Sequence, residues 1–241
     1  MPPKSPSSQV SDVSLGFELP GNDGHRARLR ERFLAGGADA IPDYELLELV
    51  LYAALPRRNI KPLAKALLAH FGSFADVIAA PRARLMEIPG LGESAVAQFK
   101  VVEAAALRLL RTQLMHKPAL SSWNALVDYC TAAMGRSPHE EFRVLFLNRK
   151  NVLIADEVLN RGTVDHTPVY PREILKRALE LSASALILVH NHPSGDPTPS
   201  RADIEMTREI VAAARTLKLA VHDHIVVGRG GTASFKSLGL L

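Results

Sequence analysis

The hydrophobic positions in the first half of the chain recur at helical spacing. Segments 25–37, 43–55 and 59–72 repeat apolar residues every three or four positions, and glycines end the first and the third. Two shorter apolar segments, 74–80 and 82–88, indicate short helical turns, and a tight turn then leads into one long helix. No strand pattern occurs in this half, which is therefore predicted to be all-α.

The pattern changes after His116, Lys117 and Pro118. Runs rich in β-branched and aromatic residues now occur between amphipathic helices, and a short turn joins the first two runs, as in a hairpin. The predicted elements are a helix with a serine N-cap at 121–135, strands at 142–148 and 152–159, a helix at 171–184, a strand at 185–190, a helix at 200–218, and strands at 219–228 and 232–235. Strands interleaved with helices indicate an α/β fold.

These changes in pattern divide the chain into three parts. Residues 1–22 are rich in proline, serine and glycine without periodicity, so we predict a disordered tail. Residues 23–117 are predicted to form the helical module, and residues 118–241 the α/β domain. A chain of 241 residues is long enough for two domains of ordinary size.

Composition is that of an ordinary soluble globular protein. Hydrophobic residues make up 47% of the chain and charged residues 22%, which excludes wholesale disorder. No apolar run approaches the ~18 residues of a membrane-spanning helix. The N-terminus lacks the continuous apolar core of a secretory signal. We therefore expect a cytoplasmic protein that has no membrane partner.

Cysteine content and charge restrict the chemistry further. The single cysteine, Cys130, excludes an intrachain disulfide and a cysteine-rich zinc finger, so a metal site must use histidines and carboxylates. The formal net charge of +4 and the isoelectric point near 9.3 permit contact with nucleic acid without requiring it.

The candidate chemistry is concentrated in the segment HNHPSGDPTPSRAD, which follows an apolar strand. His190 and His192 are two positions apart, so on a strand both imidazoles point to the same side. A loop rich in proline and glycine then turns the chain back, and Asp203 falls in the first turn of the next helix. Two imidazoles and one carboxylate leave a fourth position for water, as in catalytic zinc sites. The spacing therefore predicts a zinc site that makes hydroxide near neutral pH.

Helix capping competes as an explanation for part of this motif. Ser200 and Asp203 have the spacing of a capping box, with an acid where glutamate or glutamine usually stands. Capping alone does not account for two histidines at the end of one strand, or for the long loop that follows. We therefore interpret the whole segment as a metal site.

The same segment carries a family resemblance. His-x-His-x7-Ser-x2-Asp is the signature of the JAMM (MPN+) metalloproteases, and every signature position from His190 to Asp203 matches it. HNHPSGDPTPS, VYPREILKRALE and HDHIVVG also resemble the RadC family, over nearly all of the chain from His25 onward. The resemblance implies a JAMM-type zinc domain preceded by a helical, DNA-associated module, in a family with a historical DNA-repair label. It does not fix the substrate.

The resemblance also implies a general acid and base, because JAMM enzymes use a glutamate just before the first strand. Glu140 and Glu141 both stand there, and strand alternation puts them on opposite faces, so only one can face the metal. RadC-like sequences have Glu-x-Phe at this point, which favours Glu140, and Glu157 is a distant third candidate. Ser200 is implied to help hold the oxyanion, although capping would also explain this residue.

A second pair of histidines flanks Asp223 on another predicted strand. His222 and His224 share one face, but the segment has no proline-rich loop and no nearby third carboxylate on its own side. RadC-like sequences favour Asp-His at 223 and 224. We predict that these residues support the metal ligands or belong to the core.

The helical module contains IPGLG at residues 88–92, which we interpret as the hairpin of a helix-hairpin-helix. Gly90 and Gly92 permit a tight turn, and N–H groups at the start of the next helix suit a phosphate oxygen. The pattern predicts non-specific contact with duplex DNA, and Lys100 could reach the same strand. A plain connection between two packed helices is the alternative.

These patterns together predict an all-α helix-hairpin-helix module followed by a JAMM-type α/β zinc domain. The expected activity is zinc-dependent hydrolysis of a peptide or isopeptide bond in a peptide or protein substrate. The alternative is a DNA-repair-associated accessory protein that binds DNA and has a non-catalytic metal site. A zinc nucleobase deaminase would need a Cys-x-x-Cys pair, which one cysteine cannot supply. A metal-dependent nuclease would favour a more acidic site.

Overall fold

The computed structural model describes residues 22–115, 117–162 and 170–241. Apart from Asn22, the tail predicted at 1–22 lies outside the described residues, so its disorder stays a prediction.

The chain divides into two compact units, residues 1–66 and 67–241. The described helices of the first unit are α1 (Asn22–Gly36), η1 (Ala38–Ala40) and α2 (Asp43–Tyr52), and α3 (Lys61–Phe71) continues into the second unit. The guanidinium of Arg26 is buried in the first unit, where it donates to the carbonyl oxygen of Leu55 at 3.0 Å and lies over the ring of Tyr52. This buried cation helps to hold α1 on the segment after α2.

The second unit continues with helices. These are α4 (Phe74–Ala79), α5 (Arg82–Met86), α6 (Glu93–Leu114), η2 (Ala119–Ser122) and α7 (Trp123–Met134). All regular structure within 22–115 is helical, which confirms the all-α prediction for this half. None of the described helices is long and apolar enough to cross a membrane. The compact units divide within α3, and the domain boundary expected between 117 and 118 stays a prediction.

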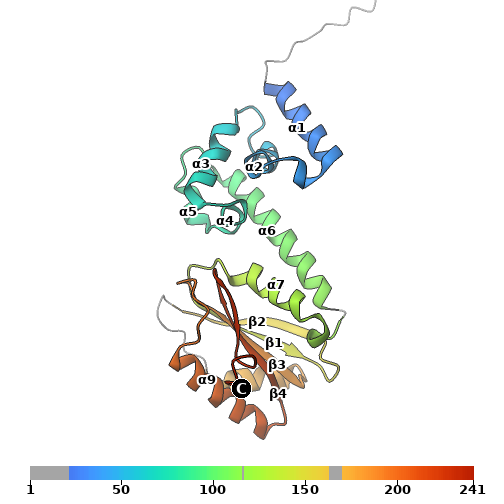
Figure 1. The fold of residues 1–241 in the computed structure, drawn as a ribbon, viewed down its shortest axis with the longest axis vertical. Helices are drawn as coiled ribbons and strands as arrows, with labels where there is room; N and C mark the ends of the chain where they lie inside the picture. Colours follow the sequence, from blue (N-terminus) through green and yellow to red (C-terminus); the bar gives the residue numbers. More distant parts are fainter. Residues whose placement is uncertain (1–21, 116, 163–169) are drawn as a thin grey trace, which may run out of the picture. The chain divides into compact units, whose positions relative to one another are not determined.

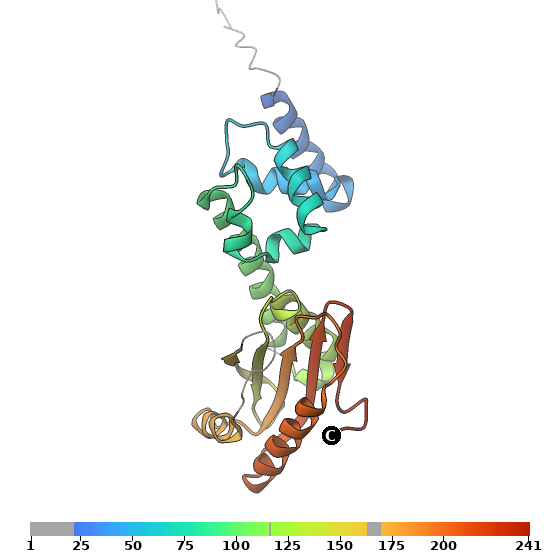
Figure 2. The ribbon, with the colours of Figure 1, turned by 90° about the vertical axis from the view of Figure 1, so that its left-hand side faces the viewer.

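In the described residues after α7, five strands form one mixed sheet. The strands are β1 (Glu141–Leu147), β2 (Leu153–Arg161), β3 (Ala185–Asn191), β4 (Ala220–Gly228) and β5 (Gly231–Ser234), with α8 (Pro171–Glu180) and α9 (Arg201–Thr216) before and after β3. Their order is β2-β1-β3-β4-β5. Only β3 and β4 pair in parallel. Figure 2 shows the strands side by side, with α9 in front of them. The predicted α/β fold and its β1–β2 hairpin are confirmed.

Helices cover both faces of the sheet, which explains why β3 begins with the unbroken apolar run ALILV. Ile187 and Val189 belong to a core with α7, whereas Leu186 and Leu188 belong to a core with α8 and α9. Figure 1 shows α7 and α9 on opposite faces. Because side chains alternate along a strand, His190 follows Leu186 and Leu188 onto the α9 face.

Candidate metal centre

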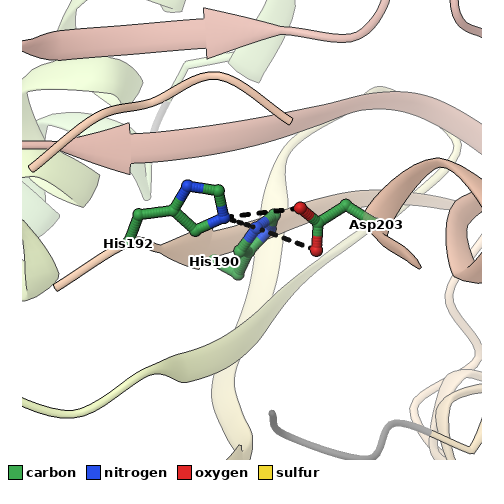
Figure 3. Close-up of side chains that lie close together, drawn as sticks. All are labelled: His190, His192 and Asp203. Carbon is green, nitrogen blue, oxygen red and sulfur yellow. Dashed lines mark hydrogen bonds and ion pairs between the residues drawn. The ribbon is translucent and has the colours of Figure 1, made fainter. Parts of the chain in front are cut away.

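His190, His192 and Asp203 meet beyond the last apolar residues of β3 (Figure 3). The Nε2 atoms of His190 and His192 are 3.0 Å apart. Nε2 of His190 lies 3.3 Å from Oδ1 of Asp203, and Nε2 of His192 lies 3.4 Å from Oδ2. All the candidate ligand atoms lie within 4.8 Å of one another. One ion could reach all three, since zinc binds nitrogen and oxygen ligands at about 2.0–2.2 Å.

Backbone hydrogen bonds shape the loop that carries His192. The N–H of His192 donates to the carbonyl oxygen of Val227 in β4 at 2.9 Å, and the N–H of Gly195 donates to the carbonyl oxygen of His192 at 3.0 Å. Gly195 has a φ of 93°, which glycine adopts without strain. The loop therefore turns sharply after His192 and returns to the start of α9, where Asp203 lies.

Asp203 is held in place by Ser200, the N-cap of α9. The hydroxyl and the N–H of Ser200 both donate to Oδ2 of Asp203, at 2.6 and 2.7 Å, and the N–H of Asp203 donates to Oγ of Ser200 at 3.2 Å. This is a complete capping box. Capping and metal binding are compatible here, because Oδ1 still faces His190. The hydroxyl proton of Ser200 points to Asp203 in this arrangement, and an oxyanion role for Ser200 stays a prediction.

The backbone also orients the imidazole of His192. Its Nδ1 lies 2.8 Å from the carbonyl oxygen of Asp196, which can only accept. Nδ1 therefore carries the proton, and Nε2 presents its lone pair to the cluster. The side chain of His192 is 18% exposed, compared with 1% for His190, so the site opens on the His192 side.

A chain of buried hydrogen bonds orients His190. Its Nδ1 lies 2.7 Å from Nε2 of His224, and Nδ1 of His224 lies 2.6 Å from Oγ1 of Thr207. The Thr207 hydroxyl donates to the carbonyl oxygen of Asp203 at 2.6 Å, so it must accept from His224. His224 is then an acceptor at Nε2, and His190 donates to it. This hydrogen-bond chain leaves the lone pair of His190 on Nε2, the atom that faces the cluster.

The donor set fits a divalent cation. Two imidazole lone pairs 3.0 Å apart repel each other unless a proton or a cation lies between them, and Asp203 adds a negative charge beside them. Imidazole nitrogen and carboxylate oxygen are both ligands of zinc. Within the described ranges, this is the one group of three or more His, Cys, Asp or Glu residues that could hold a metal ion.

The electrostatics of the site keep Asp203 ionised. Burial alone would raise the pKa of its carboxyl, but the neighbouring imidazoles of His190 and His192 and the hydrogen bond from Ser200 outweigh burial and hold that pKa far below its usual range. Asp203 also raises the pKa of His192, against the effect of burial, because its carboxylate accepts a hydrogen bond from Nε2 when that ring is protonated. Burial, with the nearby His190, lowers the pKa of His224. His224 is therefore neutral, as the hydrogen-bond chain requires.

Glu140, which precedes β1, and Glu141, which is its first residue, have different surroundings. Both side chains are half-buried. The charge of Glu140 contributes to the raised pKa of His192, which indicates that this carboxylate is near the cluster. The carboxylate of Glu141 instead accepts a hydrogen bond from the hydroxyl of Ser137 at 3.3 Å. This difference favours Glu140 over Glu141 as the general base, and its catalytic role stays a prediction.

The remaining titratable candidates differ in their relation to the site. Glu157 pairs with Arg177 of α8 at 2.7 Å. Nε2 of His222 lies 2.7 Å from Oδ1 of Asn151, in the turn between β1 and β2. His224 belongs to the hydrogen-bond chain. Of the second histidine pair, His224 thus supports a candidate metal ligand, whereas His222 contacts the hairpin turn.

The turn that precedes α6 contains both glycines of residues 88–92, and a helix-hairpin-helix at this place stays a prediction. Gly90 has a φ of 85°, which suits glycine, and Gly92 is the N-cap of α6. The ammonium of Lys100 donates to the carbonyl oxygen of Ile78 at 3.1 Å and to Glu103 at 2.8 Å. Lys100 is thus engaged by groups of its own unit, which does not support the expectation that it reaches DNA. Contact of the two glycines with DNA stays a prediction.

Two buried polar residues beside the site were not predicted. Thr207 stands four residues after Asp203, a spacing that puts both on one face of α9 and could have indicated it. Asn191 separates the two histidines at the end of an apolar strand. A buried carboxamide in such a strand needs hydrogen-bond partners, and this need could have indicated that Asn191 contacts a neighbouring segment.

Comparison with known proteins covers both halves of the chain. A family model described as a RadC-like JAB domain matches residues 120–240, and one described as UPF0758 N-terminal matches residues 24–97. A UPF0758 protein of Rhodobacter capsulatus is 65% identical over 213 residues, which cover 88% of this chain and 100% of the relative. A UPF0758 protein of Ruegeria pomeroyi is 57% identical over 217 residues, covering 90% of this chain and 97% of the relative.

Proposed function

Because the chain belongs to the RadC-like JAB domain family, we propose that it is a zinc-dependent hydrolase that cuts a peptide or isopeptide bond. The observation that carries the proposal is the convergence of His190, His192 and Asp203, each oriented by its own hydrogen bonds. Three protein ligands and an opening on the His192 side suit a catalytic metal better than a structural one. Glu140 is the group that would move the proton, because it stands two residues before Phe142, which pairs with His190, and its charge contributes to the raised pKa of His192.

Each residue has a defined task in this proposal. Zinc held by the three ligands would supply a Lewis acid that activates water and polarises a carbonyl group. Glu140 accepts a proton from the attacking water and donates it to the leaving amine, so the carboxylate is restored at the end of the cycle. Asp203 remains an anionic ligand throughout the neutral range because of its depressed pKa. Rotation of the Ser200 hydroxyl toward the substrate would make it a donor to the oxyanion.

Metal analysis is the first part of the test. The purified chain should hold close to one zinc ion, and His192→Ala should lose it. A wild-type chain with no stoichiometric metal, or His192→Ala with its metal retained, would refute the proposed centre.

Hydrolysis is the second part. The zinc-loaded wild type, Glu140→Gln and Glu141→Gln are incubated with a peptide library and with isopeptide-linked proteins, and the products are identified by mass spectrometry. We expect cleavage by the wild type and Glu141→Gln, and a loss of about 100-fold or more in Glu140→Gln, as for removal of a general base. Cleavage by Glu140→Gln at the wild-type rate would show that this residue is not the base.

We propose, as the second candidate function, a DNA-binding accessory protein with a non-catalytic metal site. The observation that favours it is the turn at Gly90 and Gly92, after which α6 begins without a side-chain cap, as at phosphate-binding helix ends. In this case duplex DNA binding should fall steeply with salt and be lost when both glycines are replaced by leucine. Glu140→Gln would then have no functional effect.

A further inference from the structure

Asn191 stands between the two histidines, but its side chain lies on the other face of β3. It is 1% exposed, so its carboxamide needs partners inside the protein. Oδ1 accepts a hydrogen bond from the N–H of Glu141 at 2.8 Å, and Nδ2 donates to the carbonyl oxygen of His139 at 3.1 Å. Both hydrogen bonds go to the residues on either side of Glu140.

These two hydrogen bonds extend the sheet beyond its last backbone pair. The β1–β3 ladder ends where Phe142 faces His190. A carboxamide has one acceptor and N–H donors, as a peptide group does, so the Asn191 side chain can bond to the chain where the ladder stops. On the other side, the N–H of Gly162 donates to the carbonyl oxygen of Glu140 at 2.9 Å. The backbone around Glu140 is thus tied on both sides.

We propose that Asn191 is a positioning residue that holds Glu140 at a fixed distance from His190 and His192. This inference rests on the proposed function, in which Glu140 moves the proton. Asn191 belongs to the same strand as His190. One rigid strand therefore carries both a proposed metal ligand and the side chain that bonds to the backbone on either side of Glu140. Such coupling matters because a displacement of about 1 Å in a reacting group can cost about 100-fold in rate.

A purely structural role for Asn191 predicts a different result. Its loss would then lower stability without moving Glu140. Asn148 is a matched control, because it follows the other end of β1 and its Oδ1 accepts from the N–H groups of Lys150 and Val152 at 2.8 and 3.1 Å. Asn148→Ala therefore also removes two bonds between a carboxamide and the backbone, but at the β1–β2 turn.

The first measurement is hydrogen exchange of the Glu141 N–H, followed by NMR in the full chain. Asn191→Ala should speed this exchange by on the order of tenfold, because the N–H loses its acceptor. Asn191→Asp keeps an acceptor oxygen at this place and should retain most of the protection. In Asn148→Ala, the Glu141 N–H should exchange at the wild-type rate. Wild-type protection of Glu141 in Asn191→Ala would overturn the proposal.

The second measurement reports how far Glu140 lies from the ion. Co²⁺ bound in place of zinc broadens the NMR signals of nearby nuclei, and the effect falls steeply with distance. We expect strong broadening of the Glu140 side-chain signals in the wild type and in Asn148→Ala. It should be weaker in Asn191→Ala, whose Co²⁺ affinity should stay that of the wild type. Broadening equal to the wild type in Asn191→Ala would overturn the proposal.

If Asn191→Ala does not fold, the Co²⁺ measurement is made on Asn191→Asp instead. Its carboxylate cannot donate to the carbonyl oxygen of His139 and repels it. The Glu140 signals should then be broadened less than in the wild type, and equal broadening would overturn the proposal.

Failure of this inference can be distinguished from failure of the proposed function. Exchange of the Glu141 N–H requires neither metal nor substrate, so it decides the role of Asn191 in tying the segment even if no ion binds. If Co²⁺ broadens the Glu140 signals of a wild-type chain that cleaves no substrate, the proposed hydrolase activity is refuted. The proposed positioning of Glu140 by Asn191 is not affected by that result.

Discussion

Nδ1 of His190 donates a hydrogen bond to Nε2 of His224 at 2.7 Å, and this contact decides which nitrogen of His190 faces the candidate metal site. Thr207 determines which ring donates in this bond. Its hydroxyl donates to the carbonyl oxygen of Asp203, so it must accept from Nδ1 of His224, and this leaves Nε2 of His224 as an acceptor. His224 is completely buried and its pKa is lowered by burial, so it has no second proton to offer. The candidate ligands are therefore oriented by residues outside the candidate ligand set.

Thr207→Val should weaken metal binding without removing a ligand. Valine keeps the shape of threonine but cannot accept from Nδ1 of His224, so His224 loses the bond that fixes its tautomer. We expect zinc affinity to fall by about 10–100-fold, as for other supporting partners of metal ligands, measured by competition with a chromogenic chelator. Thr216→Val is the control, because that hydroxyl donates to the carbonyl oxygen of Ala213 on the same helix. Equal affinities for the two variants would contradict the hydrogen-bond chain.

Metal affinity should depend on pH through His192. The hydrogen bond with Asp203 raises the pKa of this imidazole above its usual value of 6.5 in the metal-free chain. Metal binding requires the unprotonated ring, so affinity should fall as the pH is lowered through the raised pKa, earlier than for an ordinary histidine. Asp203 does not contribute there, because its pKa is far lower. Calorimetric titration with zinc across about pH 6–8 tests this, and an affinity independent of pH would contradict it.

The element types and the candidate ligands could be predicted because each depends on local sequence. The apolar run of β3 reflects burial on both faces, and the two-residue spacing of His190 and His192 is enough to bring their rings together. Ser200 and Asp203 are close in sequence, so the capping box was also visible. Local patterns of this kind do not depend on which strands become neighbours.

The supporting contacts could not be predicted, because they join segments that are distant in sequence. His224 meets His190 only because β4 pairs in parallel with β3, and Asn191 meets Glu141 only because β1 lies on the other side of β3. One local prediction was correct only in part, because Ser122 is the N-cap residue of α7 but its side chain makes no capping hydrogen bond. The hydroxyl of Ser122 donates to the carbonyl oxygen of Pro118 and does not cap α7, because the 3₁₀ turn η2 precedes that helix.

A buried ion pair between β1 and β2 should dominate the stability of this hairpin. Arg143 donates to both oxygens of Asp156, at 2.7 and 2.8 Å, and Tyr129 of α7 donates to the same carboxylate. Asp156→Ala leaves the guanidinium buried without its partner, which should cost about 3–5 kcal/mol in denaturant unfolding. Glu157→Ala is the control, since its pair with Arg177 is half-exposed and should contribute much less. Similar losses of unfolding free energy in both variants would show that burial of the Arg143–Asp156 pair is unimportant.

The last turn of α6 belongs to the apolar core on the α7 face of the sheet. Leu114 is 2% exposed and lies in the same apolar cluster as Leu126 and Met134 of α7. All the proposed ligands and Glu140 nevertheless come after residue 117. The positions of the ligands and Glu140 would allow an independent domain to begin after residue 117, whereas the packing of Leu114 places its start before residue 114.

A fragment of residues 118–241 should fold and bind zinc, because it contains the whole sheet, α7, α8, α9 and every proposed ligand. It should be less stable than a fragment of residues 105–241 by about 1.5–3 kcal/mol, the value of burying one leucine side chain. A chelator should lower the melting temperature of both fragments, since zinc binds only the folded state. Equal stability would mean that Leu114 adds nothing to this core. A shorter fragment that stays molten in the presence of zinc would mean that the end of α6 is an obligatory part of the α/β domain.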